Sequence, residues 1–201
     1  MVINLSRKYD ITVYCSSLSC DTNIKKYHRS KLKYIPLKAN GWQSVIFDFI
    51  SIVLSLRNDK IIILGASAGI LMPFLSKFSN KFILNFGGLD WQRSKWNYFV
   101  RHFLRFSEKY AIKYSKFIIS DNKGIQDYIL KKYDKISYLI EYGGDQAIKI
   151  KPNNNDIQKY PFLRLKYAIC VARIQSDNNI EMILDSFKHN DKIPIVFIGN
   201  W

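Results

Sequence analysis

The sequence alternates short apolar runs with longer amphipathic stretches, and this alternation limits the folds open to the chain. The apolar runs lie at residues 11–15, 61–64, 82–86, 117–120 and 137–140. They lack strict alternation of apolar and polar residues, which is typical of strands buried on both faces of a parallel sheet. Since strand and helix patterns follow each other in turn, we predict an α/β fold in which helical crossovers join parallel strands.

Helical periodicity occupies the segments between these runs. Apolar residues recur at spacings of three and four in the segments 46–54, 70–78, 96–114 and 125–133. The first of these belongs to the longest apolar stretch, Val45 to Leu56, which contains Asp48. That stretch is shorter than the roughly 20 residues of a membrane-spanning helix. We expect a buried helix, whose apolar face is formed by Ile46, Phe49, Ile50, Val53 and Leu54.

The pattern changes after residue 140, where glycines and a polar, asparagine-rich stretch at 149–156 indicate a linker. We predict a first domain at residues 1–146, a linker at 147–165 and the start of a second domain at 166–201. This second domain contains a strand at 167–172, a helix at 179–189 and a strand at 195–198. One β-α-β unit is too small to bury a core of its own, so we expect the second domain to be incomplete.

The beginning of the chain is also expected to lack an element. Residues 2–9 resemble the last turns of a helix that leads into the strand at 11–15, and no strand comes before them. A doubly wound sheet normally opens with a strand and a glycine-rich turn. We therefore expect the first strand of the first domain to be missing.

The composition points to anionic partners and a reducing compartment. The 201 residues include 31 Lys and Arg against 16 Asp and Glu, a net charge of +15. This charge favours binding to nucleic acid, sugar nucleotides or an anionic membrane. A compositional bias of the source genome, which enriches the protein in lysine and asparagine, would explain the charge equally well. The cysteines, Cys15, Cys20 and Cys170, have no metal-site spacing, and we expect buried free thiols. The N-terminus becomes polar too soon for a signal peptide.

The loop from Gly87 to Trp96, after the central strand, is the most informative segment. Ligands of open parallel sheets bind beyond the carboxyl ends of the strands. Here Asp90 could accept a proton from a sugar hydroxyl, Arg93 and Lys95 could balance phosphate charge, and the tryptophans could stack on a sugar. An equally weighted interpretation is structural, in which Asp90 caps the next helix and the tryptophans anchor it to the sheet.

Three further segments allow a binding role beside a structural one. Gly65–Gly69 contains only small residues, which favour tight packing of strand on helix somewhat over phosphate binding. Arg173 follows the strand at 167–172, where it would hold a diphosphate or form a surface ion pair. Cations recur every fourth position on the helix at 96–114, opposite aromatic residues that we assign to the core. This stripe comprises Arg101, Arg105, Lys109 and Lys113, and is a solvated face or a surface for anionic lipid.

The segment Asn85-Phe-Gly-Gly-Leu-Asp-Trp-Gln-Arg-Ser-Lys-Trp96 resembles the N-V-D-G-L-E-W-K-R-x-K-W signature of bacterial rhamnosyltransferase-type glycosyltransferases (family 4 type). Further blocks of that family are similar to successive segments, so that the resemblance spans essentially the whole chain. These segments are 106–115, 119–128, 141–145, 171–174, 178–182 and 198–201. Asp90 stands where the signature usually has Glu, and Gly87 where it usually has Asp.

The resemblance implies the GT-B architecture, in which two Rossmann-like domains face a cleft. It implies a sugar, with rhamnose as one candidate, transferred from a nucleotide-sugar donor to a lipid-diphosphate-linked glycan. Such transfer belongs to bacterial surface polysaccharide or O-antigen assembly at the inner, cytoplasmic face of the membrane. No metal or other cofactor is implied. By resemblance, Asp90 is the catalytic candidate, and the substrate-binding candidates are Gly87, Gly88, Trp91, Arg93, Lys95 and Arg173.

Two alternatives remain beside this enzyme. Family members also carry an opening strand with a glycine-rich loop and a donor-binding half with paired glutamates, and neither is found in this sequence. We therefore expect the chain alone to transfer little sugar, and a noncatalytic remnant that binds acceptor or membrane is the second hypothesis. A basic nucleic-acid-binding module is the third, but the sequence has no recognition helix, zinc site or RNA-binding signature, and we expect no nucleic-acid partner.

Overall fold

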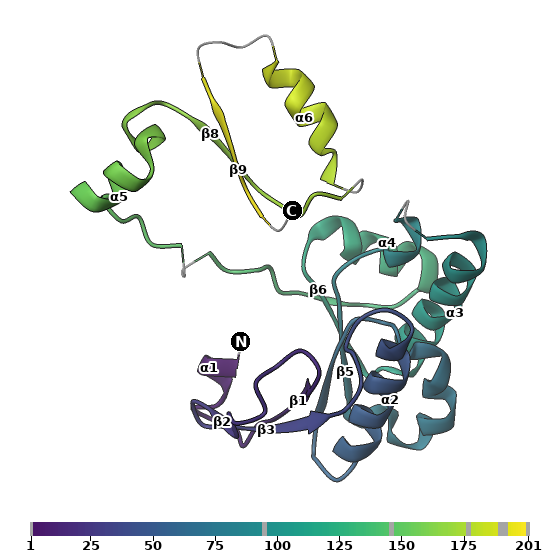
Figure 1. Ribbon diagram of the computed structural model, residues 1–201. Helices are drawn as coiled ribbons and strands as arrows, with labels where there is room; N and C mark the ends of the chain where they lie inside the picture. Colours follow the sequence, from purple (N-terminus) through teal and green to yellow (C-terminus); the bar gives the residue numbers. More distant parts are fainter. Residues whose placement is uncertain (1, 94–95, 145–146, 176–177, 189–192, 200–201) are drawn as a thin grey trace. The chain divides into compact units, whose positions relative to one another are not determined.

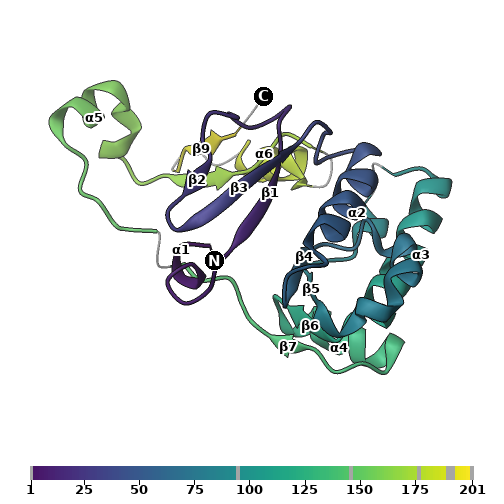
Figure 2. The same ribbon diagram turned by 90° about the horizontal axis from the view of Figure 1, so that it is seen from below.

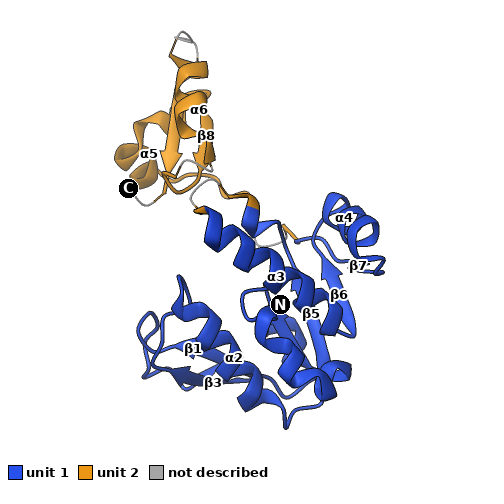
Figure 3. Ribbon diagram, turned by 90° about the vertical axis from the view of Figure 1, so that its right-hand side faces the viewer, with its two compact units in different colours: residues 1–91, 98–142 blue, residues 92–97, 143–201 orange. Residues whose placement is uncertain are grey.

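The computed structural model of the chain describes residues 2–93, 96–144, 147–175, 178–188 and 193–199 (Figure 1). The chain divides into two compact units (Figure 3). Unit 1 comprises residues 1–91 and 98–142, and unit 2 comprises residues 92–97 and 143–201. The sequence-based domain limits at 146 and 166 stay a prediction.

Unit 1 is built around a parallel four-stranded sheet. Its strands, in spatial order, are β4 (Ile61–Leu64), β5 (Phe82–Phe86), β6 (Phe117–Ser120) and β7 (Tyr138–Leu139). The connections contain the 3₁₀ segments η1 (Gly69–Lys81) and η2 (Asp90–Gln92) and the helices α3 (Tyr98–Tyr114) and α4 (Lys123–Tyr133). All three pairings in the sheet are parallel. The expected α/β, Rossmann-like fold class is thereby confirmed.

The first expected strand is not part of this sheet. β1 (Thr12–Ser16) pairs in parallel with β3 (Ser30–Ile35), which also pairs antiparallel with β2 (Lys26–Tyr27). Figures 1 and 2 show this three-stranded sheet, in purple, to one side of the four-stranded one. The prediction of one sheet containing residues 11–15 is wrong because β3, whose exposed lysines alternate with less exposed residues, offers a partner that the sequence analysis did not include.

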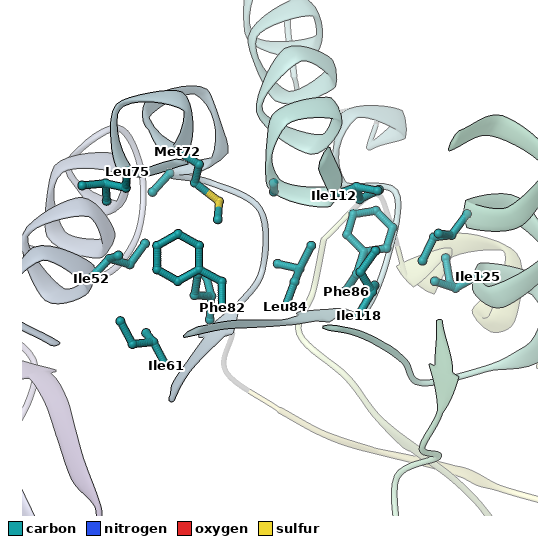
Figure 4. Close-up of a cluster of buried hydrophobic side chains, with 14 residues drawn as sticks. Ile52, Ile61, Met72, Leu75, Phe82, Leu84, Phe86, Ile112, Ile118 and Ile125 are labelled. Atoms are coloured by element: carbon teal, nitrogen blue, oxygen red, sulfur yellow. The ribbon is translucent and has the colours of Figure 1, made fainter. Parts of the chain in front are cut away.

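The hydrophobic core lies on one face of the four-stranded sheet. Figure 4 shows side chains from the strands meeting those from α2, η1, α3 and α4 on one side of the sheet. Phe82 and Leu84, from the central strand, are both 0% exposed. On β4, by contrast, Ile62 and Leu64 point away from the core and are exposed. The expectation of strands buried on both faces is therefore wrong for β4, because the helices of this core cover the opposite face.

Two helical segments differ from their expected form. α2 (Gln43–Ser55) is a helix as expected, but it buries Phe47 and Ile52, while Ile46, Val53 and Leu54 of the expected face are exposed. The expected helix at 70–78 is a run of 3₁₀ turns, broken at Leu75 and containing Pro73. Proline removes a backbone donor and disfavours a regular α-helix at that point. The short α1 (Val2–Leu5) fits the expected helix end.

Unit 2 contains the expected β-α-β unit. β8 (Ala168–Val171) and β9 (Ile195–Ile198) pair in parallel, and α6 (Ile180–Phe187) lies between them in sequence. The segment expected to be a linker also contains a helix, α5 (Asn154–Lys159), followed by the 3₁₀ turn η3 (Pro161–Arg164). Asn153 and Asp156 form a reciprocal capping box. The asparagine run thus begins a helix, because asparagine side chains cap free N–H groups well.

The three cysteines are free thiols, as expected, but they are not buried. Cys15 and Cys170 are half-buried, and Cys20 is exposed. Burial raises the pKa of the Cys15 thiol, and neighbouring Cys20 raises it further. Cys15 therefore stays protonated at neutral pH.

The single-sided core predicts unequal effects for two leucines on neighbouring strands. Leu84→Ala removes a fully buried side chain and should lower the free energy of unfolding by about 2–5 kcal/mol. Leu64→Ala is the matched control, because Leu64 is 63% exposed and should cost under about 1 kcal/mol. Urea unfolding followed by far-UV circular dichroism measures both. Equal losses would contradict a core confined to one face.

Candidate functional site

The candidate site lies at the carboxyl edge of the four-stranded sheet. Because β4, β5, β6 and β7 are parallel, the segments that follow them leave from the same edge. Ligands of open α/β sheets bind at that edge. The segment after the central strand β5 contains four of the expected site residues, Gly87, Gly88, Asp90 and Trp91.

The two glycines and Asp90 lie on the accessible part of this loop. A Cβ atom at Gly88 would meet no atom within 4 Å, so the backbone borders open space there. Asp90 is exposed and begins the 3₁₀ turn η2. The loop thus presents a carboxylate two residues after a stretch of backbone that borders open space, and the catalytic role of Asp90 stays a prediction.

Trp91 fixes this loop to the helices. Its indole N–H donates a hydrogen bond of 3.0 Å to the Glu108 carboxylate, and the Arg105 guanidinium lies 4.0 Å from the ring centroid. Both partners come from α3, one turn apart on the helix. Stacking of a cation on indole is attractive because the ring face carries partial negative charge. Trp91 therefore ties the loop to α3, whereas the structural interpretation had the tryptophans anchor that helix to the sheet.

Glu108 is the centre of a buried polar cluster. Its side chain is 3% exposed, and besides Trp91 it accepts hydrogen bonds from Tyr128, Tyr133 and Lys132. The Lys132 ammonium lies 3.1 Å from the carboxylate, and the Tyr133 hydroxyl 2.5 Å. A buried charge is tolerated only where it is paired and its lone pairs are filled, and four donors satisfy both conditions here. The cluster joins the loop after β5, α3 and α4.

The cluster shifts the titration of its members. Burial, and then the hydrogen bond to the Glu108 carboxylate, raise the pKa of Tyr128 and strongly raise that of Tyr133. Burial alone would lower the pKa of Lys132, but its contacts with Tyr128 and Glu108 outweigh burial and raise it. The phenols therefore stay neutral and the ammonium stays charged at physiological pH. Their hydrogen bonds to Glu108 are present throughout that range.

A second network holds the loop after β4. Ser107 accepts a hydrogen bond from the Ile70 backbone N–H at 3.2 Å and donates one to the Ser67 carbonyl at 3.1 Å. A Cβ atom on Gly69 would lie 1.9 Å from the Ser107 carbonyl oxygen, so only glycine fits this contact with α3. The small residues at 65–69 therefore serve tight packing, which was the favoured interpretation of that segment.

Asp48 joins the same region from α2. Ser67 donates a short hydrogen bond to its carboxylate. Burial raises the pKa of Asp48, and the bond from Ser67 offsets only part of that rise. The charged form is thus less favourable in the folded protein than in the unfolded chain.

The remaining expected site residues are not described as part of unit 1. Arg93 belongs to the segment 92–97 of unit 2, and Lys95 lies outside the described residues. Arg173 is exposed beyond the end of β8 in unit 2, and its carbonyl accepts a 2.7 Å hydrogen bond from the Asn178 side chain. Its position after the strand is the expected one. Contact of these cations with a diphosphate stays a prediction.

The long helix differs from its expected orientation. On α3 the buried residues are Ser107, Glu108, Ala111 and Ile112. Phe99 and Phe106, which were assigned to the core, are 81% and 52% exposed. That assignment is wrong because the close contact at Gly69 requires small residues at the centre of the helix face.

Sequence reasoning did not assign roles to Glu108, Asp48, Asp121 or Tyr142. One signal was present for Glu108, because it shares a helix face with Ala111 and Ile112 at spacings of three and four. An acid within an apolar stripe indicates a buried, partnered carboxylate. Asp48 carried the same signal, because it is the one acid in the apolar stretch from Val45 to Leu56, whereas Asp121 and Tyr142 carry no comparable pattern.

Within the described ranges, no group of three His, Cys, Asp or Glu side chains could hold a metal ion. No helix in the same ranges is long and apolar enough to cross a bilayer. Both findings concern the described residues alone.

The parallel four-stranded sheet, with loops at its carboxyl edge, defines a Rossmann-like α/β protein. The family model described as "Domain of unknown function (DUF1972)" matches residues 43–145, slightly more than half of the chain. The chain belongs to this family. No curated protein is significantly similar to the chain. The matched segment contains the loop after β5 and the Glu108 cluster.

Replacing Glu108 tests the anchor of the loop. In Glu108→Gln the two phenols and Lys132 lose the carboxylate that accepts from them, and the free energy of unfolding should fall by on the order of 3 kcal/mol. Asp127→Asn is the control, since its carboxylate forms an exposed ion pair with Lys123 and should cost at most about 0.5 kcal/mol. Urea unfolding measures both, and an unchanged midpoint for Glu108→Gln would contradict the anchor.

Replacing Asp48 tests the raised pKa. Its ordinary value is 3.8, and a higher value in the folded state means that stability is lost as the pH rises through the folded-state pKa. Asp48→Asn carries no charge and still accepts from Ser67. The variant should therefore melt at a higher temperature than wild type at pH 7, with the difference disappearing below about pH 4. Melting curves from pH 3 to 7 measure this, and a lower melting temperature at pH 7 would refute it.

Proposed function

We propose that the chain acts as a GT-B-type glycosyltransferase of bacterial surface polysaccharide or O-antigen assembly. The transferred sugar, with rhamnose as one candidate, comes from a nucleotide-sugar donor and goes to a lipid-diphosphate-linked glycan. The observation that carries the proposal is the exposed carboxylate of Asp90 on an anchored loop at the carboxyl edge of a parallel sheet. The resemblance of residues 85–96 to the glycosyltransferase signature supports it.

In the proposed reaction Asp90 accepts the proton of the acceptor hydroxyl. The hydroxyl oxygen forms a bond to the anomeric carbon of the donor sugar, and the bond from that carbon to the nucleoside diphosphate breaks. The leaving diphosphate carries the negative charge, and Arg173 is the residue that the family resemblance assigns to neutralising it. A carboxylate and an arginine in these roles supply general-base catalysis and stabilisation of the leaving group.

Anchoring supports this role for Asp90. A catalytic group contributes most when its neighbours hold it close to the productive geometry. Trp91, the next residue, is fixed by a hydrogen bond to a carboxylate and by a stacked guanidinium. These contacts limit movement of the loop at the residue next to Asp90.

The exposed face of α3 supports a membrane partner. Exposed aromatic residues, Phe99 and Phe106, lie on this helix together with the exposed cations Arg105, Lys109 and Lys113. Aromatic rings insert at the boundary of head groups and acyl chains, while lysine and arginine attract anionic lipids. A net charge of +15 acts in the same direction. Peripheral binding at the inner membrane face would bring the enzyme to a lipid-linked acceptor.

Transfer and binding assays with the purified chain test the proposal. The probes are dTDP-rhamnose and UDP-hexoses as donors and a polyprenyl-diphosphate-linked glycan in vesicles as acceptor. We expect acceptor binding and weak transfer, and Asp90→Asn should reduce transfer by about 10²-fold or more while retaining binding. Asp127→Asn, an exposed carboxylate on α4, is the control.

The outcomes separate the hypotheses. Transfer that falls in Asp90→Asn supports the enzyme. Acceptor binding without any transfer favours the noncatalytic remnant. Absence of both binding and transfer contradicts the proposal.

A further inference from the structure

Three neighbouring strand ends converge beside Gly87. Phe86 of β5 is in register with Ser120 of β6, and Ser120 is in register with Leu139 of β7. The Ile140 N–H continues this pairing with a 2.9 Å hydrogen bond to the Ser120 carbonyl. Gly87, Asp121 and the segment 140–142 therefore leave the sheet side by side.

Two polar groups point at the bare Cα of Gly87. A Cβ atom built there would lie 3.3 Å from Asp121 Oδ2 and 3.6 Å from the Tyr142 hydroxyl oxygen. Any side chain at position 87 would occupy the space between the carboxylate and the phenol. Since the residue is glycine, that space is open to atoms of a ligand.

A hydrogen bond to one carboxylate oxygen fixes the orientation of the Asp121 side chain. Its Oδ1 accepts a 2.8 Å hydrogen bond from the Asn122 side-chain amide. The amide oxygen of Asn122 in turn accepts from the Ile125 N–H at 2.9 Å, which fixes the asparagine at the start of α4. Among the described residues neither Asp121 Oδ2 nor the Tyr142 hydroxyl has a hydrogen-bond partner. Both atoms are thus available on the side that faces Gly87.

The hydrogen-bonding groups of Asp121 and Tyr142 match those of a neutral polyol. A carboxylate accepts hydrogen bonds only, a phenol can donate and accept, and two adjacent sugar hydroxyls match this pair. A phosphate group would be repelled by the carboxylate. A metal ion would need more oxygen ligands than this pair provides.

We propose that Gly87, Asp121 and Tyr142 form a binding site for the hydroxyl groups of a sugar. Asp121 accepts from one hydroxyl, Tyr142 bonds an adjacent one, and the sugar ring lies against Gly87. Asp90 lies three residues further along the same loop. The assignment of the bound sugar to the glycan acceptor rests on the proposed function, whereas the sugar site itself rests on this geometry.

Binding of simple glycosides tests the site directly. The probes are the methyl α-glycosides of rhamnose, glucose, galactose and N-acetylglucosamine, measured by saturation-transfer NMR titration of the purified chain. At least one should bind, and Asp121→Asn and Tyr142→Phe should each weaken its binding about tenfold or more. Asp127→Asn is the matched control, and Tyr142 is 76% exposed, so its variant leaves the core intact.

A second test of the site moves the carboxylate from position 121 to position 87. Asp121→Gly should abolish binding, and adding Gly87→Asp should restore part of it. The Cβ atom that carries the new carboxylate would lie 3.3 Å from the position of the lost Asp121 Oδ2. The site is overturned if no glycoside binds, or if binding is indifferent to both Asp121→Asn and Tyr142→Phe.

The proposed function fails separately from the site. Sugar transfer that does not depend on Asp121 would overturn the site and leave the function supported. Glycoside binding that depends on Asp121, without transfer to or binding of the lipid-linked glycan, would support the site and contradict the function.

Discussion

The buried carboxylate of Glu108 is the interaction on which the arrangement of unit 1 depends. It accepts hydrogen bonds from the loop after β5 and from α4, and it lies on α3 itself. Removing a charge from water is costly, and the cost is offset only when all the donors are in place together. The carboxylate therefore links three segments that are distant in sequence, and the position of Asp90 depends on that link through Trp91.

The sequence predicted the four-stranded sheet well and its surroundings poorly. Strands β4, β5 and β6 coincide with the apolar runs at 61–64, 82–86 and 117–120, because each strand places alternate apolar residues in the core. β3 has lysines at alternate positions and resembles a polar loop until its pairing with β1 is known. The exposure of an aromatic residue on a helix likewise depends on which face of the helix packs against the core. Periodicity alone does not determine that face.

The sequence predicted only those candidate site residues that lie together in one segment after a strand. Gly87, Gly88 and Asp90 follow a strand, and ligands of parallel sheets bind after strands, so local order in the sequence was sufficient. Asp121 and Tyr142 enter the proposed sugar site only because the registers of β5, β6 and β7 bring them to Gly87. Such convergence depends on pairing between strands that lie tens of residues apart in the chain.

Ser107 and Glu108 are adjacent residues of α3, and each holds a different loop of the sheet edge. Ser107 bonds the segment after β4, while Glu108 bonds the segment after β5. Adjacent residues of one helical turn thus fix both loops by hydrogen bonds. Substitutions at exposed positions of these loops can therefore change what the loops bind while the hydrogen bonds of Ser107 and Glu108 stay in place.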